Sequence, residues 1–244
     1  MSDTGFHSAA AAEVGHSVLS DLRLFKKAGM ELKQRPPDEA AARAVIQAYQ
    51  EHRAEPWLTA FLLGCIRHDV GYDIVRTILL AGTPSAFGYA GKAMALIGGQ
   101  RAAGDLMDIL NSSTSWRIRQ EAIYGLEELD YKPAVPFLIE AYSRGHLGPA
   151  PSISRLVAEE VTEQVLLGWL RSDNENDAKL ACKVIEQRVK RLMMTDGHPV
   201  NLDHRARQLP GPEVAAAVAD VLEVGRISLR PDTVALLRSW SSQS

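Results

Sequence analysis

The sequence predicts an all-α chain, an α-solenoid (alpha-alpha superhelix) in which antiparallel helix pairs stack in a row. Aromatic residues make up 6% of the 244 residues whereas alanine and leucine are abundant, and this balance favours helices over β-sandwiches and barrels. Prolines and glycines recur at short intervals, and the apolar residues between them have helical spacing. The apolar pattern itself repeats about every 30 residues, which is typical of a repeat architecture.

Capping residues and apolar stripes indicate where the helices begin. An apolar stripe that starts at Val14 supports a long first helix, and Asp38 follows two prolines at the start of the next one. Pro56 and Pro84 stand at first turns, where the missing N–H costs nothing. No segment has the alternation of a strand. The expected helices are, in chain order, about 9–33, 38–50, 56–68, 72–81, 84–97, 101–111, 115–129, 133–144, 152–171, 175–194, 212–224 and 231–240.

The repeat offsets define one structural unit. Ala93 and its apolar neighbours recur 29 residues later at Ala122 and have counterparts 31 residues earlier, at Leu62. Each unit is therefore a helix, a tight turn and a second helix. Such a pair cannot bury its apolar faces alone, but neighbouring pairs bury them by stacking. A compact helical bundle is the alternative fold, and it would need sustained apolar seams along long helices.

One segment carries a more specific pattern. Its first helix begins Trp116-Arg-Ile-Arg-Gln-Glu-Ala, and its second begins Pro133-Ala-Val-Pro-Phe-Leu. With Ile118-Arg119 at the position of a Val-Arg pair, the stretch 116–141 resembles one HEAT-like repeat, of the short kind named for phycobilisome lyases. This resemblance implies a curved stack whose concave face is lined by the second helix of each pair.

The repeat pattern divides the chain into three segments. We expect N-terminal helices that cap the stack over 1–54, HEAT-like repeats over 55–145, and divergent helical repeats with a C-terminal cap over 146–244. The last helix carries Leu237 and Trp240 on its apolar side. These residues can cover the end of the stack within one chain or between two chains, so self-association through the terminal helices stays open.

Charge and cysteine content indicate the setting of the protein. A formal net charge of −3 gives little support to nucleic-acid binding, which usually requires a clear basic excess. No apolar run approaches the ~20 residues that cross a bilayer, and the N-terminus lacks the cationic and apolar regions of a secretory signal. We therefore expect a cytoplasmic protein without membrane contact. Cys65 and Cys182 fall inside apolar helical patterns, which predicts buried free thiols.

The common catalytic motifs are absent from the sequence. It has no phosphate-binding glycine loop, no His-Glu-x-x-His zinc motif and no Gly-x-Ser-x-Gly nucleophile elbow. HEAT-like di-iron hydroxylases use His-Glu pairs, but none of the seven histidines precedes a glutamate. HEAT-like DNA glycosylases combine tryptophan with a basic groove, and Trp116 beside Arg117 and Arg119 supplies only part of that set; we expect Trp116 to be a first-helix core residue. We predict no catalytic residue and no cofactor, and a binding protein rather than an enzyme.

The stretch 195–212 is long for a connection in a helical array, and such loops are often functional. Asp196, His198, Asp203 and His204 could gather around zinc or another divalent ion through nitrogen and oxygen ligands. The spacing sets no geometry in advance, so a solvated loop is the favoured interpretation.

Polar residues on the predicted second helices form candidate partner-binding columns. Thr77 and Asp108 are 31 residues apart, and Asn111 and Glu140 are 29 apart, so each pair is expected to share a column across repeats. The full candidate set is Arg76, Thr77, Asp108, Asn111, Glu140 and Arg144. Their mixed charge suits a peptide or protein partner better than a polyanion. We expect a non-enzymatic scaffold or adaptor, the alternative being a lyase- or chaperone-like or DNA-glycosylase-like HEAT protein with a pocket in its concave face.

Overall fold

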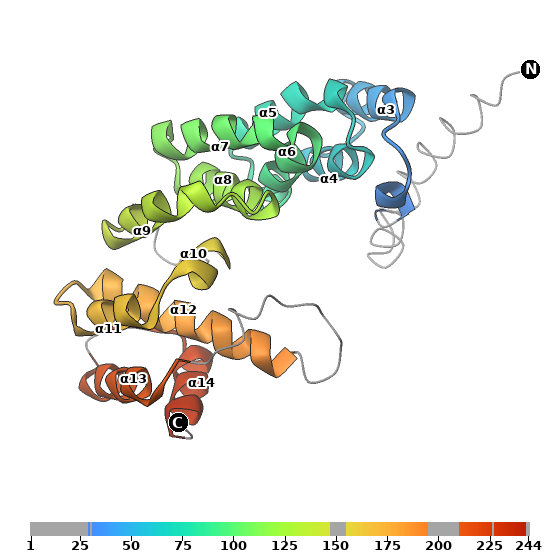
Figure 1. Ribbon diagram of the computed structural model, residues 1–244. Coiled ribbons are helices and arrows are strands. Elements are labelled where there is room, and N and C mark those ends of the chain that lie inside the picture. Colours follow the sequence, from blue (N-terminus) through green and yellow to red (C-terminus); the bar gives the residue numbers. More distant parts are fainter. Residues whose placement is uncertain (1–28, 30, 147–154, 195–209, 226, 243–244) are drawn as a thin grey trace, which may run out of the picture. The chain divides into compact units, whose positions relative to one another are not determined.

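A computed structural model describes residues 29, 31–146, 155–194, 210–225 and 227–242. Within these ranges the chain consists of helices and their connections, with no β-strand (Figure 1), so the all-helical prediction is confirmed. The chain divides into two compact units, Met1–Tyr131 and Lys132–Ser244, each described here by itself. The division falls inside the predicted repeat segment, between the two helices of the HEAT-like stretch.

The first unit is built from helix pairs joined by short turns. Helix α6 contacts both α4 and α8, so these first helices form one row, and α5 and α7 lie above them in Figure 1. Two 3₁₀ turns, η1 and η2, introduce α5 and α6. The bounds are α3 (Glu39–Gln50), α4 (Pro56–Ile66), η1 (Asp69–Gly71), α5 (Tyr72–Ala81), η2 (Pro84–Ala86), α6 (Ala90–Gly98), α7 (Gln100–Ser112) and α8 (Trp116–Glu128).

Local sequence explains where these helices begin and end. The Asp38 side chain accepts a hydrogen bond from the Ala41 N–H at 3.0 Å, which caps α3 where the sequence predicts. Pro56 opens α4. Gly99 has φ +53° at the junction of α6 and α7, in the region that favours glycine, so two helices follow each other with almost no loop. Of the expected first helix, 9–33, residue 29 and residues 31–33 are described, and these are helical.

The predicted helix 84–97 is wrong in its first part. Pro84 opens only a 3₁₀ turn, and α6 begins six residues later at Ala90. Gly88 separates the two with φ +90°, a conformation that a helix cannot contain. The Gly88 N–H instead donates to the side chain of Glu121 on α8, so the break is fixed by a tertiary contact.

The predicted repeat positions form the core. Nearly all of them are buried, so the apolar spacing identifies the core side of each helix. The buried set of the first unit includes Leu62, Leu63, Ile66, Val75, Ile78, Leu79, Ala93, Met94, Ile97, Leu106, Ile109, Leu110, Ala122, Ile123 and Leu126. Trp116 is an exception: it was expected in the core, but 40% of its surface is exposed because it lies at the very start of α8.

Small residues hold the row of first helices close together. A Cβ on Gly64 of α4 would lie 2.9 Å from the Ala93 Cβ of α6, and one on Gly125 of α8 would lie 2.5 Å from the Gly91 carbonyl oxygen. A Cβ on Gly91 would meet the carbonyl oxygen of Glu121 at 1.7 Å. Such backbone approach is possible only without side chains at the crossing points. The second-helix layer is tied differently, by a 2.7 Å hydrogen bond from the Tyr72 hydroxyl to Asp105.

The second unit contains shorter helices around one long one. Helix α12 contacts α9, α10, α11 and α14, while α13 packs against α11 and α14. The bounds are η3 (Lys132–Ala134), α9 (Val135–Ser143), α10 (Arg155–Glu160), α11 (Glu163–Arg171), α12 (Glu175–Met194), α13 (Pro212–Val224) and α14 (Pro231–Ser241). In α14, Leu237 and Trp240 are buried within this unit. Cys65 and Cys182 are buried thiols that form no disulfide, as predicted.

A second correction concerns the expected helix 152–171, whose first three residues lie outside the described part. The chain breaks it at Val161 and Thr162 into α10 and α11. Thr162 starts α11 as its N-cap, with its hydroxyl oxygen accepting from the Val165 N–H. The Arg188 guanidinium of α12 donates to the carbonyl oxygens of Ala158 and Val161, which satisfies the end of α10. None of the described helices is long and apolar enough to cross a membrane.

Candidate binding groove

The residues predicted to bind a partner are all exposed, and they belong to two different units. Arg76 and Thr77 lie on α5, and Asp108 and Asn111 on α7, in the first unit. The Thr77 hydroxyl donates to the Asp73 carbonyl oxygen at 2.8 Å, within its own helix. The other two, Glu140 and Arg144, belong to the second unit and form an ion pair at 2.5 Å. Their part in binding stays a prediction.

The hypothetical metal ligands Asp196, His198, Asp203 and His204 lie outside the described residues. Among the residues that are described, no cluster of three or more histidine, cysteine, aspartate or glutamate side chains is arranged to hold a metal ion.

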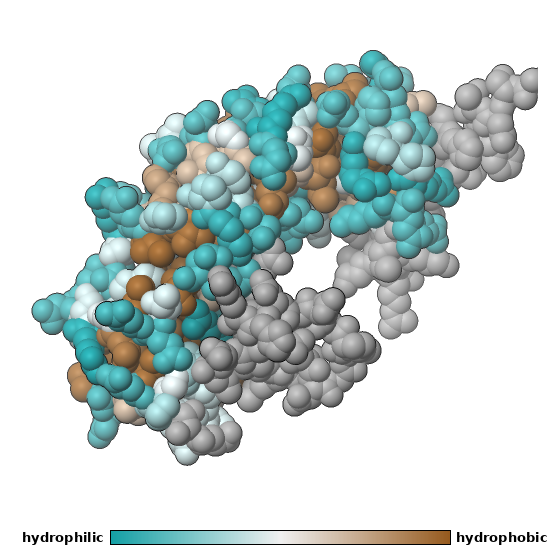
Figure 2. Space-filling model, viewed as in Figure 1, coloured by the Kyte–Doolittle hydropathy of each residue, from teal (hydrophilic) through white to brown (hydrophobic). Residues whose placement is uncertain are grey.

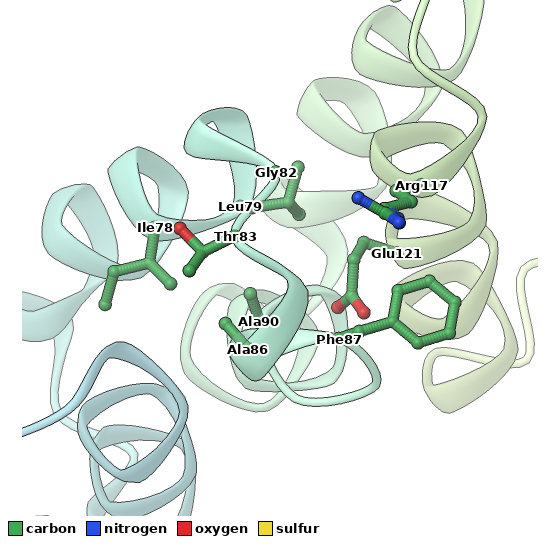
Figure 3. Close-up of a pocket in the computed structure, with 9 residues that line it drawn as sticks. All are labelled: Ile78, Leu79, Gly82, Thr83, Ala86, Phe87, Ala90, Arg117 and Glu121. Atoms are coloured by element: carbon green, nitrogen blue, oxygen red, sulfur yellow. The ribbon is translucent and has the colours of Figure 1, made fainter.

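Glu121 is the most deeply buried carboxylate of the first unit's described residues, with 4% of its surface exposed. It points from α8 toward the start of α6, as Figure 3 shows, and accepts hydrogen bonds from the backbone N–H groups of Gly88 and Gly91, the latter at 2.9 Å. Burial raises the pKa of Glu121, and the backbone donors oppose this shift. The carboxylate therefore acts as an N-terminal cap supplied by a neighbouring helix.

The space beside Glu121 is too small for a substrate. It measures about 10 Å³, roughly the volume needed for a single water molecule. Ile78, Leu79 and Ala90 make most of its wall apolar, and Arg117 lies on the same helix as Glu121 (Figure 3). Sequence reasoning did not single out Glu121 because its partners are about 30 residues away in the chain.

A larger groove lies between α4 and α6, on the first-helix row of the first unit. Its volume is about 230 Å³, and it is open to solvent along one side. Small residues make the floor, because α4 and α6 approach closely at Gly64 and Ala93. The lining residues are Lys33, Ala60, Phe61, Gly64, Cys65, Gly88, Tyr89, Lys92, Ala93, Leu96 and Glu128. We refer to this feature as the α4–α6 groove.

Aromatic rings form one wall of the α4–α6 groove. The Tyr89 ring lies 5.9 Å from that of Trp57 and 6.1 Å from that of Phe61, the latter edge-on. These distances are within the range of favourable ring pairs, so the rings hold one another in place. The groove therefore has a preformed apolar wall on the first-helix row.

Charged side chains occupy the rim of the groove. Lys33 and Lys92 are exposed, and in the described part of the chain neither forms an ion pair. The Lys92 ammonium instead lies 5.7 Å from the centre of the Tyr124 ring, a cation–π geometry. Glu128, at the end of α8, is the acidic residue of the rim. Among the described residues, the rim thus carries two cations and one anion.

Cys65 lies in the groove but is not a reactive thiol. Only 1% of its surface is exposed, and burial raises its pKa to about 11. Nucleophilic cysteines require the thiolate, and this group is protonated at neutral pH. The groove therefore offers apolar contact and charge, without a nucleophile at Cys65.

A second aromatic cluster continues the same row. The Phe87 ring lies 5.9 Å from Trp116 and 5.8 Å from Tyr124, both near edge-on. The guanidinium of Arg117 lies 5.4 Å from the Trp116 ring. Lys92 lines the α4–α6 groove and also contacts the Tyr124 ring of this cluster, so the cluster adjoins the groove. Partly exposed aromatic residues therefore occur along the whole row of first helices, from α4 to α8.

The second unit has a groove of its own, between α11 and α13. Its volume is about 300 Å³, and apolar residues at its base include Leu170 and Val221. Val224 at its edge is 74% exposed. An ion pair between Arg171 and Glu213, 2.8 Å long, lies on its rim. On the face visible in Figure 2, apolar side chains appear as short strips between hydrophilic ones, without one broad apolar face.

The α4–α6 groove was not predicted from the sequence, because the predicted partner-binding residues all lie on second helices. A signal was present in the repeat alignment: Phe61 and Lys92 stand 31 residues apart, next to the aligned core positions Leu62 and Ala93. An aromatic residue and a lysine at the same position of the predicted repeat indicate a surface that can bind a partner through apolar and charged contacts.

Comparisons with protein-family models, with curated proteins and with solved structures give no match for this chain. The likeness to HEAT-like repeats therefore depends on the residues quoted above.

Proposed function

We propose that this protein is a non-enzymatic scaffold or adaptor of the HEAT-like α-solenoid type, and that it binds another protein through the α4–α6 groove. The observation that carries the proposal is the groove itself: an open, preformed channel with a small-residue floor, an aromatic wall and a charged rim. Peptide-binding surfaces combine these features, because apolar pockets provide affinity and charged rims provide orientation.

Helix packing in the first unit supports the solenoid part of the proposal. The first helices approach through glycine and alanine at Gly64, Ala93 and Gly91, so this row is the more closely packed of the two. In a stack of helix pairs, the more closely packed row lies on the inner side of the bend. We infer that first helices line the inner surface in this unit, rather than second helices.

The chemistry of the buried groups supports binding over catalysis. The oxygens of Glu121 are held by backbone N–H groups, and the thiol of Cys65 is protonated at neutral pH. A general base or nucleophile must instead be able to reach a substrate. The buried thiols Cys65 and Cys182, which form no disulfide, suit a reducing, cytoplasmic setting.

The test compares capture of partners by charge-reversed variants. Tagged wild-type protein, Lys92→Glu and Arg43→Glu are used to recover proteins from a lysate of the source cells, with quantification by mass spectrometry. Arg43 is the matched control because it is also an exposed cation of the first unit, on α3 and outside the groove lining. We expect Lys92→Glu to lose most of the recovered protein and Arg43→Glu to retain it.

Two outcomes would overturn the proposal. Recovery of nothing above an untagged control would argue against an adaptor, and equal recovery by wild type and Lys92→Glu would argue against the groove. Charge reversal at Asp108 and Glu140 in parallel tests the second-helix columns, and selective loss there would move the binding surface to them.

A further inference from the structure

We propose that the partner segment of the α4–α6 groove is an acidic peptide that inserts one large apolar side chain between glutamate or aspartate residues. This inference rests on the proposed function and specifies the chemistry of the partner at that site. It follows from three properties of the groove, which are its size, its lining and the distribution of its charges.

The size of the groove indicates one anchoring side chain. At about 230 Å³ it lies below the roughly 300–1,000 Å³ of pockets that enclose small organic ligands. It is open along one side, so a chain can pass over it while a single side chain enters. The floor at Gly64 and Ala93 has no polar side chain, and Phe61 and Tyr89 stand beside it. A leucine-sized aliphatic or an aromatic group matches these walls.

The charges on the groove rim indicate that the residues next to the anchoring side chain of the peptide are acidic. Lys33 and Lys92 both line the groove and come from two different segments, so two ammonium groups are available to a peptide that passes over it. Neither lysine is neutralised by an ion pair in the described part of the chain. Glu128 marks the α8 end of the rim and disfavours an acidic residue there. The peptide is therefore acidic next to the lysines and neutral or basic toward Glu128.

A protein segment fits these charges better than a nucleic acid. Single-stranded nucleic acids bind to grooves that are positive along their length, with aromatic residues on which successive bases stack. Here Glu128 interrupts the positive rim, and the Tyr89 ring is engaged by Trp57 and Phe61. The complete chain carries a net charge of −3, which also opposes a polyanion.

The test measures binding of a defined peptide to the full-length protein. The probe is a short fluorescein-labelled peptide with one leucine flanked on both sides by glutamates, and the readout is fluorescence anisotropy. Replacing the leucine by glycine is expected to weaken binding about tenfold or more, because the burial of one leucine side chain is lost. Raising the salt concentration is expected to weaken it further, because the lysines are exposed.

Variants of the protein then test the sign of the charge effect. Lys92→Glu is expected to weaken binding about three- to tenfold, and Glu128→Lys to strengthen it about threefold. Arg43→Glu is the control, since it makes the same change in net charge outside the groove lining and should leave the affinity unchanged. Circular dichroism of each variant confirms that the fold is retained, and all three positions are exposed.

The inference is overturned if the acidic peptide does not bind, if a lysine-flanked peptide binds equally well, or if Glu128→Lys weakens binding. Tighter binding of fluorescein-labelled oligo-uridylate than of the peptide would point to nucleic acid. If wild-type protein captures partners in a Lys92-dependent manner while the acidic peptide fails, the adaptor function stands and only the partner chemistry is wrong.

Discussion

The carboxylate of Glu121 is buried because its oxygens take the place of water at the start of α6. The N–H groups of Gly88 and Gly91 would otherwise be among the unpaired donors of a helix N-terminus. Removing both the carboxylate and the donors from water is costly, and their hydrogen bonds offset this cost only in part, since the pKa of Glu121 is raised.

This raised pKa predicts a pH-dependent stability. The pKa of Glu121 is about 4.3 in the unfolded chain and higher in the folded protein. At pH values between the two, the folded protein binds the proton of Glu121 more strongly than the unfolded chain does. The contribution of Glu121 to the free energy of unfolding is therefore largest below the unfolded pKa and falls as the pH rises through the folded value. Glutamine does not titrate, so we expect the free energy of unfolding of Glu121→Gln to lack this decrease with pH. The difference in free energy of unfolding between Glu121→Gln and wild type should therefore shift in favour of the variant from pH 4 to 7.

The measurement is urea unfolding of both proteins at several pH values, with Glu128→Gln as control. Glu128 is an exposed glutamate on the same helix, so its substitution controls for the loss of one carboxylate from α8. A difference between wild type and Glu121→Gln that stays constant with pH, or that changes in the opposite direction, would contradict the expectation.

At the scale of elements, the spacing of the first helices depends on glycines that permit backbone contact. A Cβ at Gly91 would lie 1.7 Å from the Glu121 carbonyl oxygen, so Gly91→Ala must push α6 away from α8. We expect it to reduce the free energy of unfolding by about 3 kcal/mol, at the upper end for overpacking. Gly104 on α7 is the matched control, because a Cβ there meets nothing within 4 Å.

Gly104→Ala is expected to stabilise the protein by about 0.5–1 kcal/mol, since alanine replaces glycine in an exposed helical position without strain. Chemical denaturation of the two variants measures both effects. Equal destabilisation by Gly91→Ala and Gly104→Ala would show that loss of glycine itself, and not the α6–α8 contact, determines the outcome.

The sequence predicts most helices because their limits are local. Pro56 and Asp38 act within one turn of the residues they cap, and apolar spacing identifies the buried side. The two wrong helix predictions, 84–97 and 152–171, share a physical cause. The break at Gly88 is held by Glu121 of α8, and the end of α10 is held by Arg188 of α12, so both depend on residues far away in the chain. The Thr162 cap was a local signal that could have been found.

The binding groove was harder to predict than the helices that form it. Periodicity separates buried from exposed residues, but it does not distinguish an exposed lysine beside a groove, such as Lys92, from one that faces only water. The groove exists because Gly64 and Ala93 set the distance between α4 and α6. That distance follows from packing between neighbouring helices, which apolar spacing within one helix does not specify.

At the scale of the whole molecule, the chain has two compact units, and each contains one buried cysteine that is not part of a disulfide. Cys65 reports on the first unit and Cys182 on the second, because their surfaces are 1% and 0% exposed and react only when the surrounding structure opens. Since Gly91 lies in the first unit, we expect Gly91→Ala to accelerate native-state labelling of Cys65 about tenfold or more. Labelling of Cys182 should change by less than about twofold.

The reciprocal variant is Arg188→Ala, which removes the donors to the end of α10 in the second unit and should accelerate labelling of Cys182 selectively. Reaction with Ellman's reagent, followed by mass spectrometry of the peptides that carry each thiol, measures the two rates separately. Equal acceleration of both cysteines by either variant would mean that the chain opens as one cooperative body. In that case a partner bound in the α4–α6 groove would stabilise the second unit as well as the first, whereas independent opening confines this stabilisation to the unit that holds the groove.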